Sequence, residues 1–333
     1  ERMTRVKPSA TGAVIALAAE RRAAGRDIIS LGAGEPDFPT PAHICEAGRR
    51  AIDAGDTHYT PLDGTRALKE AIRRKFARDN ALSYDNDQVL VSSGAKQTCF
   101  NACLAILGPG DEAVIPAPYW VSYPDMVRLA EAEPVIIETG LEDRFTISPA
   151  ALRAALNERT RLLILNSPSN PTGACYSRRQ LVALGEVLRD FPQVVIASDE
   201  IYELIHWAGE PFVSFAQACP DLYDRTITIN GVSKCYAMTG WRIGYAGGPK
   251  TLINAMKTIQ SQCTSNPCSI SQAAAVAALD GDQACVASMT DAYRRRHDFI
   301  VEALATLPDG SNDSIWRSRS PPGSNRRSTS RTT

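Results

Sequence analysis

The chain has 333 residues, 44% of them hydrophobic, and a formal net charge of −1 at pH 7. This length suffices for one large domain and a smaller one, and the near-zero charge gives no general attraction to nucleic acid or membrane. No apolar run approaches the ~20 residues of a membrane span, and no signal peptide is recognisable. The nine cysteines form no CxxC pair, which favours reduced thiols, no bound metal and a cytoplasmic location.

Helix and strand patterns alternate over about the first 285 residues. Helical periodicity is found, in chain order, at 43–54, 66–79, 96–107, 149–157 and 178–190, with Ser148 and Ser177 as candidate N-caps. Short apolar runs bounded by turn residues predict strands at 88–92, 112–116, 134–137, 161–165, 193–197, 225–229 and 242–246. This alternation predicts an α/β domain with a largely parallel sheet, and ligands at the carboxyl ends of its strands.

The end of the chain has a different composition. A helix is expected at about 282–306, and we expect it to expose apolar surface. The residues after Leu307 are rich in Ser and Arg and almost lack apolar side chains. They cannot bury a hydrophobic face, so we predict that 308–333 is a disordered tail. The abrupt change suggests a folded domain that has been cut off.

A glycine turn follows the first predicted strand, in the stretch SSGAKQT (92–98). Gly94 allows close backbone approach, and the N-terminus of the next helix offers free N–H groups to a phosphate, with Lys96 adding a charge. An ordinary strand–turn–helix joint is an equally good interpretation of this stretch alone. Ser93 and Lys96 also form an S-x-x-K pattern of acyltransferases, but the K-T-G element that should accompany it is missing.

Two further polar stretches follow later strands. Asn170 lies in NSPSNPTG (166–173) before Pro171, which favours an extended backbone with its amide directed into a cleft. Asp199 opens DEIYE after an apolar run, so we expect it half-buried and in need of a partner. If a helical turn begins there, the side chains of Asp199 and Tyr202 face the same way. A simple turn, which Asn-Pro and Thr-Gly pairs favour, is an alternative interpretation of residues 166–173.

The last polar stretch is NGVSKCYAMTGWRIGY (230–245). It places Lys234 just after a predicted strand and Arg242 beyond a Thr-Gly turn. A lone lysine in such a place is usually a solvated loop residue. A lysine, an aspartate, an arginine and a glycine-led helix start together fit pyridoxal phosphate, which needs an amine for its Schiff base, a carboxylate beside its pyridine nitrogen and a phosphate cradle.

The sequence resembles the fold-type I aminotransferases, in the bacterial aspartate aminotransferase subgroup. The resemblance extends from about residue 5 to residue 306, and the combination of motifs is specific although single pieces are not. The matching stretches are SLGAGEPDFPTP (30–41), THYTPLDGTRALKEAI (57–72), VSSGAKQ (91–97), PAPYWVSYPDM (116–126), NSPSNPTG (166–173), SDEIYE (198–203) and SKCYAMTGWRIGY (233–245).

The resemblance implies a role for each matching residue. Lys234 corresponds to the Schiff-base lysine, which also moves the proton, and Asp199 to the partner of the pyridine nitrogen. Tyr202 and Asn170 correspond to the ligands of the ring oxygen. At the phosphate, the correspondences are Arg242, Gly94, Ala95 and Lys96, with Ser233 also binding the cofactor. Trp120 corresponds to the aromatic residue stacked on the ring, and Gly34, with Trp120 and Asn170, to the substrate-binding residues. Tyr59 corresponds to the tyrosine that reaches the phosphate of the other subunit of a homodimer.

The implied fold is a three-layer α/β sandwich with a mostly parallel sheet and an incomplete small domain. We divide the chain into an N-terminal arm and start of the small domain (1–40), a large cofactor-binding domain (41–281), a small-domain remnant (282–307) and the tail (308–333). Family members continue for roughly sixty to ninety more residues, which supply the arginine for the substrate α-carboxylate. A cofactor-binding but catalytically impaired relative is therefore a second hypothesis.

The substrates implied are small molecules, an amino acid and a 2-oxo acid, and neither nucleic acid nor membrane is expected as a partner. Aspartate or glutamate is the first choice of amino donor. Lys7 matches a lysine associated in this subgroup with prephenate as acceptor, although a plain surface lysine is about as good an interpretation. Prephenate or aromatic substrates therefore stay open.

Overall fold

A computed structural model of the chain describes residues 2–8, 10–30, 32 and 34–306. Its strands form one sheet of seven, in the order β1-β7-β6-β5-β4-β2-β3. Their bounds are β1 (Val89–Ser92), β2 (Glu112–Pro116), β3 (Glu133–Ile137), β4 (Thr160–Asn166), β5 (Val195–Asp199), β6 (Thr226–Gly231) and β7 (Gly244–Gly247). β7 is antiparallel to both of its neighbours, and the other pairs are parallel. The predicted α/β fold with a largely parallel sheet is confirmed.

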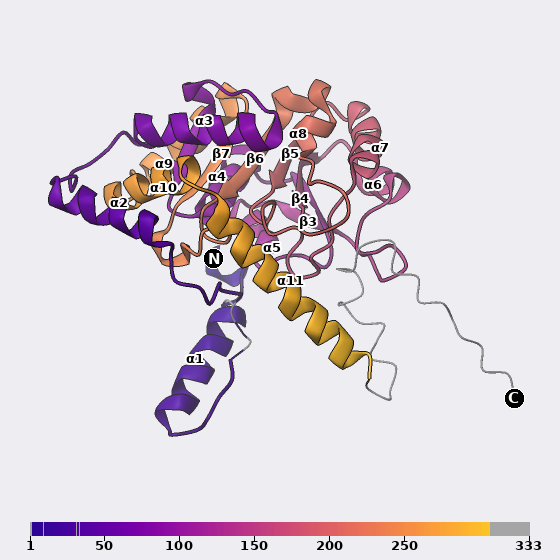
Figure 1. The fold of residues 1–333 in the computed structure, drawn as a ribbon. Coiled ribbons are helices and arrows are strands. Elements are labelled where there is room, and N and C mark those ends of the chain that lie inside the picture. Colours follow the sequence, from indigo (N-terminus) through magenta and orange to yellow (C-terminus); the bar gives the residue numbers. More distant parts are fainter. Residues whose placement is uncertain (1, 9, 31, 33, 307–333) are drawn as a thin grey trace, which may run out of the picture.

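Helices cover both faces of this sheet (Figure 1). They are α1 (Ala10–Ala23), α2 (Ala42–Asp53), α3 (Arg66–Asn80), α4 (Ala95–Ile106), α5 (Tyr123–Leu129), α6 (Pro149–Ala155), α7 (Arg178–Arg189), α8 (Phe215–Ala218), α9 (Lys250–Ser261), α10 (Ser269–Asp280) and α11 (Ala284–Leu304). Every helix and strand predicted from the sequence is present, with ends shifted by at most two residues. Ser148 and Ser177 are the N-caps of α6 and α7, as expected.

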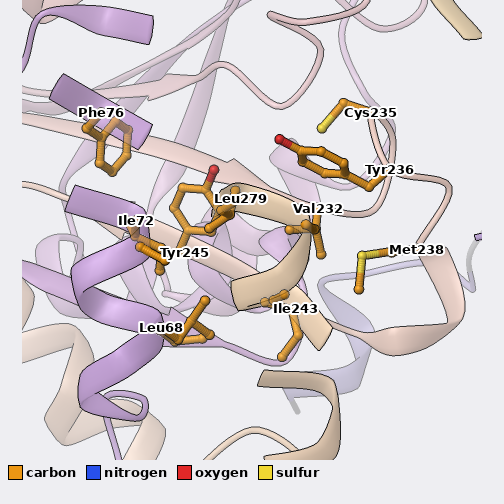
Figure 2. Close-up of a cluster of buried hydrophobic side chains, with 14 of the residues drawn as sticks. Leu68, Ile72, Phe76, Val232, Cys235, Tyr236, Met238, Ile243, Tyr245 and Leu279 are labelled. Atoms are coloured by element: carbon orange, nitrogen blue, oxygen red, sulfur yellow. The ribbon is translucent and has the colours of Figure 1, made fainter. Parts of the chain in front are cut away.

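The side-chain alternation of the strands divides the core into layers. Leu162 and Ile164 of β4 point into a cluster with α4, α5 and α9, whereas Leu163 and Leu165 pack with α6, α7 and α8 on the opposite face. A third cluster joins α3 and α10 to the β1–β7 end of the sheet. Figure 2 shows part of it, with Leu68, Ile72 and Phe76 of α3 beside Tyr245 of β7. The sheet is therefore buried on both faces.

The terminal helices are more exposed than this core, although α11 contributes Val286 to the third cluster. α1 projects away from the body of the molecule, and its Val14, Ile15 and Leu17 are exposed (Figure 1). In α11, Phe299 is 72% exposed, so this helix does present apolar surface as expected. None of the helices in the described ranges is long and apolar enough to span a membrane. The predicted tail, 308–333, lies outside the described residues.

Candidate active site

The predicted polar stretches meet at one edge of the sheet because the parallel strands end there together. The register pairs Asn166 of β4 with Asp199 of β5, and Ser92 of β1 with Gly244 of β7. Gly231, the last residue of β6, also pairs with Gly244. Ligands of α/β sheets bind beyond such carboxyl ends, so this edge is the candidate active site.

Lys234 lies in the turn that follows β6. The side chain is half-buried, and its Nζ donates a hydrogen bond of 2.7 Å to the carbonyl oxygen of Gly34. Burial lowers the pKa of Lys234, and the charge of Arg242 lowers it further, against the opposing effect of Glu35. A lysine with a lowered pKa more readily gives the neutral amine, the form that attacks carbonyl carbon.

Asp199 ends β5 and is only 4% exposed. The expectation of a half-buried carboxylate was wrong, because the whole strand end lies beneath α4 and α5. Tyr123 of α5 donates a hydrogen bond of 2.6 Å to Oδ2, and the Cys99 thiol of α4 lies 3.8 Å from the same oxygen. Burial raises the pKa of Asp199, and the Tyr123 hydrogen bond opposes this rise.

A turn and a guanidinium form a cradle at the N-terminus of α4. Gly94 has φ +91°, and Arg242 adopts a left-handed conformation that brings its Nη2 to 3.5 Å from the Ser93 carbonyl oxygen. A Cβ added at Gly94 would lie 2.1 Å from that Nη2, and one added at Gly244 would lie 2.1 Å from the Ala95 nitrogen. Glycine is therefore required at both positions. Free N–H groups and an arginine are suitable donors for a phosphate.

Aromatic and amide side chains surround this edge. The Lys96 ammonium lies 4.8 Å from the centre of the Trp120 ring, which in turn packs edge-on against Tyr123. The Nδ2 of Asn170 lies 3.5 Å from the Tyr202 hydroxyl oxygen. Residues 201–205 form turns rather than a helix, so the helical turn considered for Asp199 and Tyr202 does not occur.

Three other predicted residues complete the description. Ser233 is buried beside Lys234, and its carbonyl oxygen accepts a hydrogen bond of 3.1 Å from the Met238 amide. Tyr59 is 92% exposed in the single chain, and Lys7 is exposed in the N-terminal segment.

Sequence reasoning missed the residues that hold Asp199. Tyr123 and Cys99 are distant from Asp199 in the chain, and the sequence around each of them gives no sign that its side chain contacts a carboxylate. Tyr123 does lie within one of the stretches that carried the family resemblance, which was the available signal.

The residues present fit pyridoxal phosphate on three observations of the structure. The buried carboxylate of Asp199 has a tyrosine donor on one oxygen, and the other is held by the Ile201 amide at 3.3 Å. A Cβ at Gly94 would meet the Arg242 guanidinium, so this turn places an arginine against the N-terminus of α4, a combination that suits an anion. The amine of Lys234 has a lowered pKa. Together they match the amine, carboxylate and phosphate site that this cofactor requires.

Comparisons with known proteins agree with this fit. The family model of aminotransferase class I and II matches residues 26–316. An aspartate/prephenate aminotransferase of Nitrosomonas europaea is 55% identical over 92% of this chain and 77% of its own length. Another from Cereibacter sphaeroides is 57% identical over 91% of this chain and 76% of its own length.

Solved structures give the same result. The aspartate aminotransferase of Rhizobium meliloti superposes with a TM-score of 0.89 at 50% identity, covering 92% of this chain and 77% of that one. The Thermus thermophilus aspartate aminotransferase with maleate gives 0.87 at 46% identity, with coverage of 91% and 79%.

The fold and site thus define a pyridoxal-phosphate enzyme of the three-layer α/β type. The chain belongs to the class I and II aminotransferases, and its cofactor is pyridoxal phosphate. It acts on an amino acid and a 2-oxo acid. The S-x-x-K acyltransferase interpretation of Ser93 and Lys96 is excluded by this membership.

Proposed function

We propose that the chain transfers the amino group of aspartate or glutamate to a 2-oxo acid. The observation that carries this proposal is the convergence of Lys234, Asp199 and Arg242 at one sheet edge. The dicarboxylic donor is supported by the names of the relatives, which are aspartate or aspartate/prephenate aminotransferases. Those names also support prephenate as an alternative acceptor.

Bound pyridoxal phosphate supplies an aldehyde that condenses with amines and a pyridine ring that accepts the electrons of the broken Cα–H bond. Lys234 provides the amine that holds the cofactor, and then carries the proton removed from the substrate Cα. Its lowered pKa makes the neutral form accessible. Asp199 holds a proton at the ring nitrogen, and Tyr123 keeps that carboxylate oriented.

The other predicted residues bind and orient. The turn at Gly94, Ala95 and Lys96, at the N-terminus of α4, would hold the phosphate together with Arg242, and Ser233 would also contact the cofactor.

The Asn170 Nδ2 lies 3.5 Å from the Tyr202 hydroxyl oxygen, and the two side chains would bind the ring oxygen of the cofactor. Trp120 would cover the ring. Gly34, whose carbonyl oxygen accepts a hydrogen bond from Lys234, would close over substrate.

A homodimer with shared sites is part of the proposal, as is a cytoplasmic location. Tyr59 is 92% exposed in the single chain, which suits a side chain that reaches the phosphate of the other subunit. Mixed dimers of Tyr59→Phe and Lys234→Ala chains should contain one site with both substitutions and one with neither. Recovery of about half of the native sites would support sharing, whereas sites that all behave like one parent would refute it.

Cofactor attachment is the first test. The purified chain, loaded with pyridoxal phosphate, is reduced with borohydride and digested, and the labelled peptide is sequenced. The label should be on Lys234. Label on Lys96 would contradict the assignment, and a Lys96→Ala variant should keep the label on Lys234.

Substrate choice is the second test. Single-turnover spectra with aspartate, glutamate and phenylalanine rank the donors, and we expect aspartate or glutamate to react fastest. Lys7→Ala should slow the back-reaction with prephenate while leaving oxaloacetate unaffected, and Lys250→Ala serves as the matched surface control. Equal effects of both variants would remove Lys7 from the substrate site.

A further inference from the structure

A closed cluster of polar side chains lies between α3 and the sheet, next to the segments that carry Tyr202 and Lys234. It consists of Lys75 and Asn80 of α3, Glu203 in the turns after β5, and Asn230 of β6. None of the four is more than 5% exposed. Burying a lysine and a glutamate costs free energy unless both are fully paired. The partners of Lys75 and Glu203 therefore decide whether the cluster is stable.

Each of the four side chains has a polar partner within the cluster. Glu203 Oε1 forms an ion pair with Lys75 Nζ and accepts a hydrogen bond of 2.8 Å from Asn230 Nδ2. Glu203 Oε2 accepts one of 2.6 Å from Asn80 Nδ2, and Lys75 Nζ donates one of 2.6 Å to Asn80 Oδ1. Asp79 lies 3.8 Å from Lys75 at the rim. Glu203 is therefore held from three directions.

The cluster joins the two backbone segments that carry the cofactor residues. Glu203 directly follows Tyr202, and Asn230 precedes Lys234 by four residues. The Asn230 Oδ1 accepts a hydrogen bond of 2.8 Å from the Gly231 amide, so the side chain also shapes the end of β6. Cys235, next to Lys234, is buried in the hydrophobic cluster beside α3 (Figure 2).

Stability alone is a poor explanation for this arrangement. A buried ion pair is often no more stabilising than apolar residues of the same volume, but it fixes geometry. Catalysis is sensitive to geometry, because a displacement of ~1 Å at a reacting group can cost ~100-fold in rate. The Tyr202 hydroxyl lies 3.5 Å from Asn170, so a small movement of the turn would separate it from any shared ligand.

We propose that Lys75, Glu203 and Asn230 are positioning residues, which fix Tyr202 and Lys234 relative to each other by tying the turn after β5 and the end of β6 to α3. This inference rests on the proposed function of those two site residues. The polar contacts of the three side chains are with one another, Asn80, Asp79 and the Gly231 amide. Their effect is transmitted through the backbone of the residues next to them.

The test compares Glu203→Gln, Lys75→Met and Asn230→Ala in the cofactor-loaded protein. The readout is the pH midpoint of the visible absorption of the bound cofactor, together with kcat and KM for aspartate. A donor on the ring oxygen holds this midpoint low, so loosening Tyr202 should move it upward by ~0.5–1 pH unit in all three variants, the equivalent of one ordinary hydrogen bond. We expect kcat to fall by about tenfold or more, with KM changed less.

The direction of the shift separates positioning from a charge effect. Glu203→Gln removes a negative charge and Lys75→Met removes a positive one, so a long-range charge effect would move the midpoint in opposite directions. Opposite shifts would overturn the proposal. Asn230→Ala keeps the Lys75–Glu203 ion pair, so the proposal can still be tested with this variant if the two charge-removing variants do not fold. An unchanged midpoint and kcat in Asn230→Ala would also overturn it.

Arg225→Met is the structural control. Arg225 lies at the opposite end of β6 and donates hydrogen bonds of 2.6–2.9 Å to the carbonyl oxygens of Leu188, Phe191 and Val194. This variant should lower the unfolding temperature without moving the pH midpoint. If it moves the midpoint as much as the cluster variants do, the effect is general destabilisation and the proposal fails. Absence of the visible band in the unmodified protein would instead refute the proposed function.

Discussion

Glu200 should make the protein less stable as the pH rises toward neutral. The side chain is 1% exposed, and its Oε1 accepts hydrogen bonds from Ser198 and Ser214 at 2.7 Å and from the Phe215 amide at 3.1 Å. Within the described residues, Oε2 has no hydrogen-bond partner. Burial, aided by the negative charge of Glu203, raises the pKa of Glu200 to about 7, from its ordinary 4.5.

The size and sign of the effect follow from this pKa. Between pH 4.5 and about 7 the unfolded chain releases the Glu200 proton while the folded chain keeps it. The resulting contribution to stability is complete below pH 4.5 and lost by pH 7. At ~1.4 kcal/mol per pH unit, the loss is ~3 kcal/mol. For a chain of this size it corresponds to a change of ~5 °C in the unfolding temperature.

Glu200→Gln removes this titration, since glutamine resembles the protonated acid and keeps an acceptor for the two serines. Unfolding temperatures of both proteins are measured from pH 4.5 to 8. The variant should gain ~5 °C relative to the parent over this range. Glu158→Gln, the same substitution at an exposed position, should show no such trend. Parallel curves for Glu200→Gln and the parent would refute the reasoning.

Two further substitutions test the cofactor site. Gly94→Ala should displace the Arg242 guanidinium, because the added Cβ would lie 2.1 Å from Nη2, and should weaken pyridoxal phosphate binding by ~10-fold or more in a fluorescence titration. Gly110 has nearly the same positive φ as Gly94, but a Cβ there would meet no atom within 4 Å. Gly110→Ala should therefore leave the affinity for pyridoxal phosphate unchanged, whereas Gly94→Ala should lower it. Tyr123→Phe removes the donor to Asp199, which should raise the pKa of that carboxyl further and weaken cofactor binding by ~10–100-fold. Equal affinity for Tyr123→Phe and the parent would show that the hydrogen bond does not matter.

Some helices were missed for identifiable reasons. α10, with the sequence SISQAAAVAALD, is apolar almost all round, so it gives little periodic contrast. α1 is rich in alanine and almost wholly exposed, which again weakens the pattern. α9 does carry Ile253 and Met256 at helical spacing, a signal that sequence analysis could have used.

The sequence by itself determined the alternation of elements and the residues at the strand ends. Lys234, Asp199 and Arg242 could be found because strand patterns are local, and parallel strands bring their carboxyl ends together whatever their order. The family resemblance rested on the same local stretches.

Only the tertiary structure decided what surrounds those residues. The Tyr123–Asp199 hydrogen bond joins residues 76 positions apart, and the Lys75–Glu203 pair joins residues 128 apart. Such contacts depend on the packing of α3 and α5 against particular strands, which no local pattern encodes. Burial also comes from this packing, and burial is the largest influence on the pKa values of Asp199, Glu200 and Lys234. The positions of the candidate site residues could therefore be read from the chain, whereas their electrostatics were set by the fold.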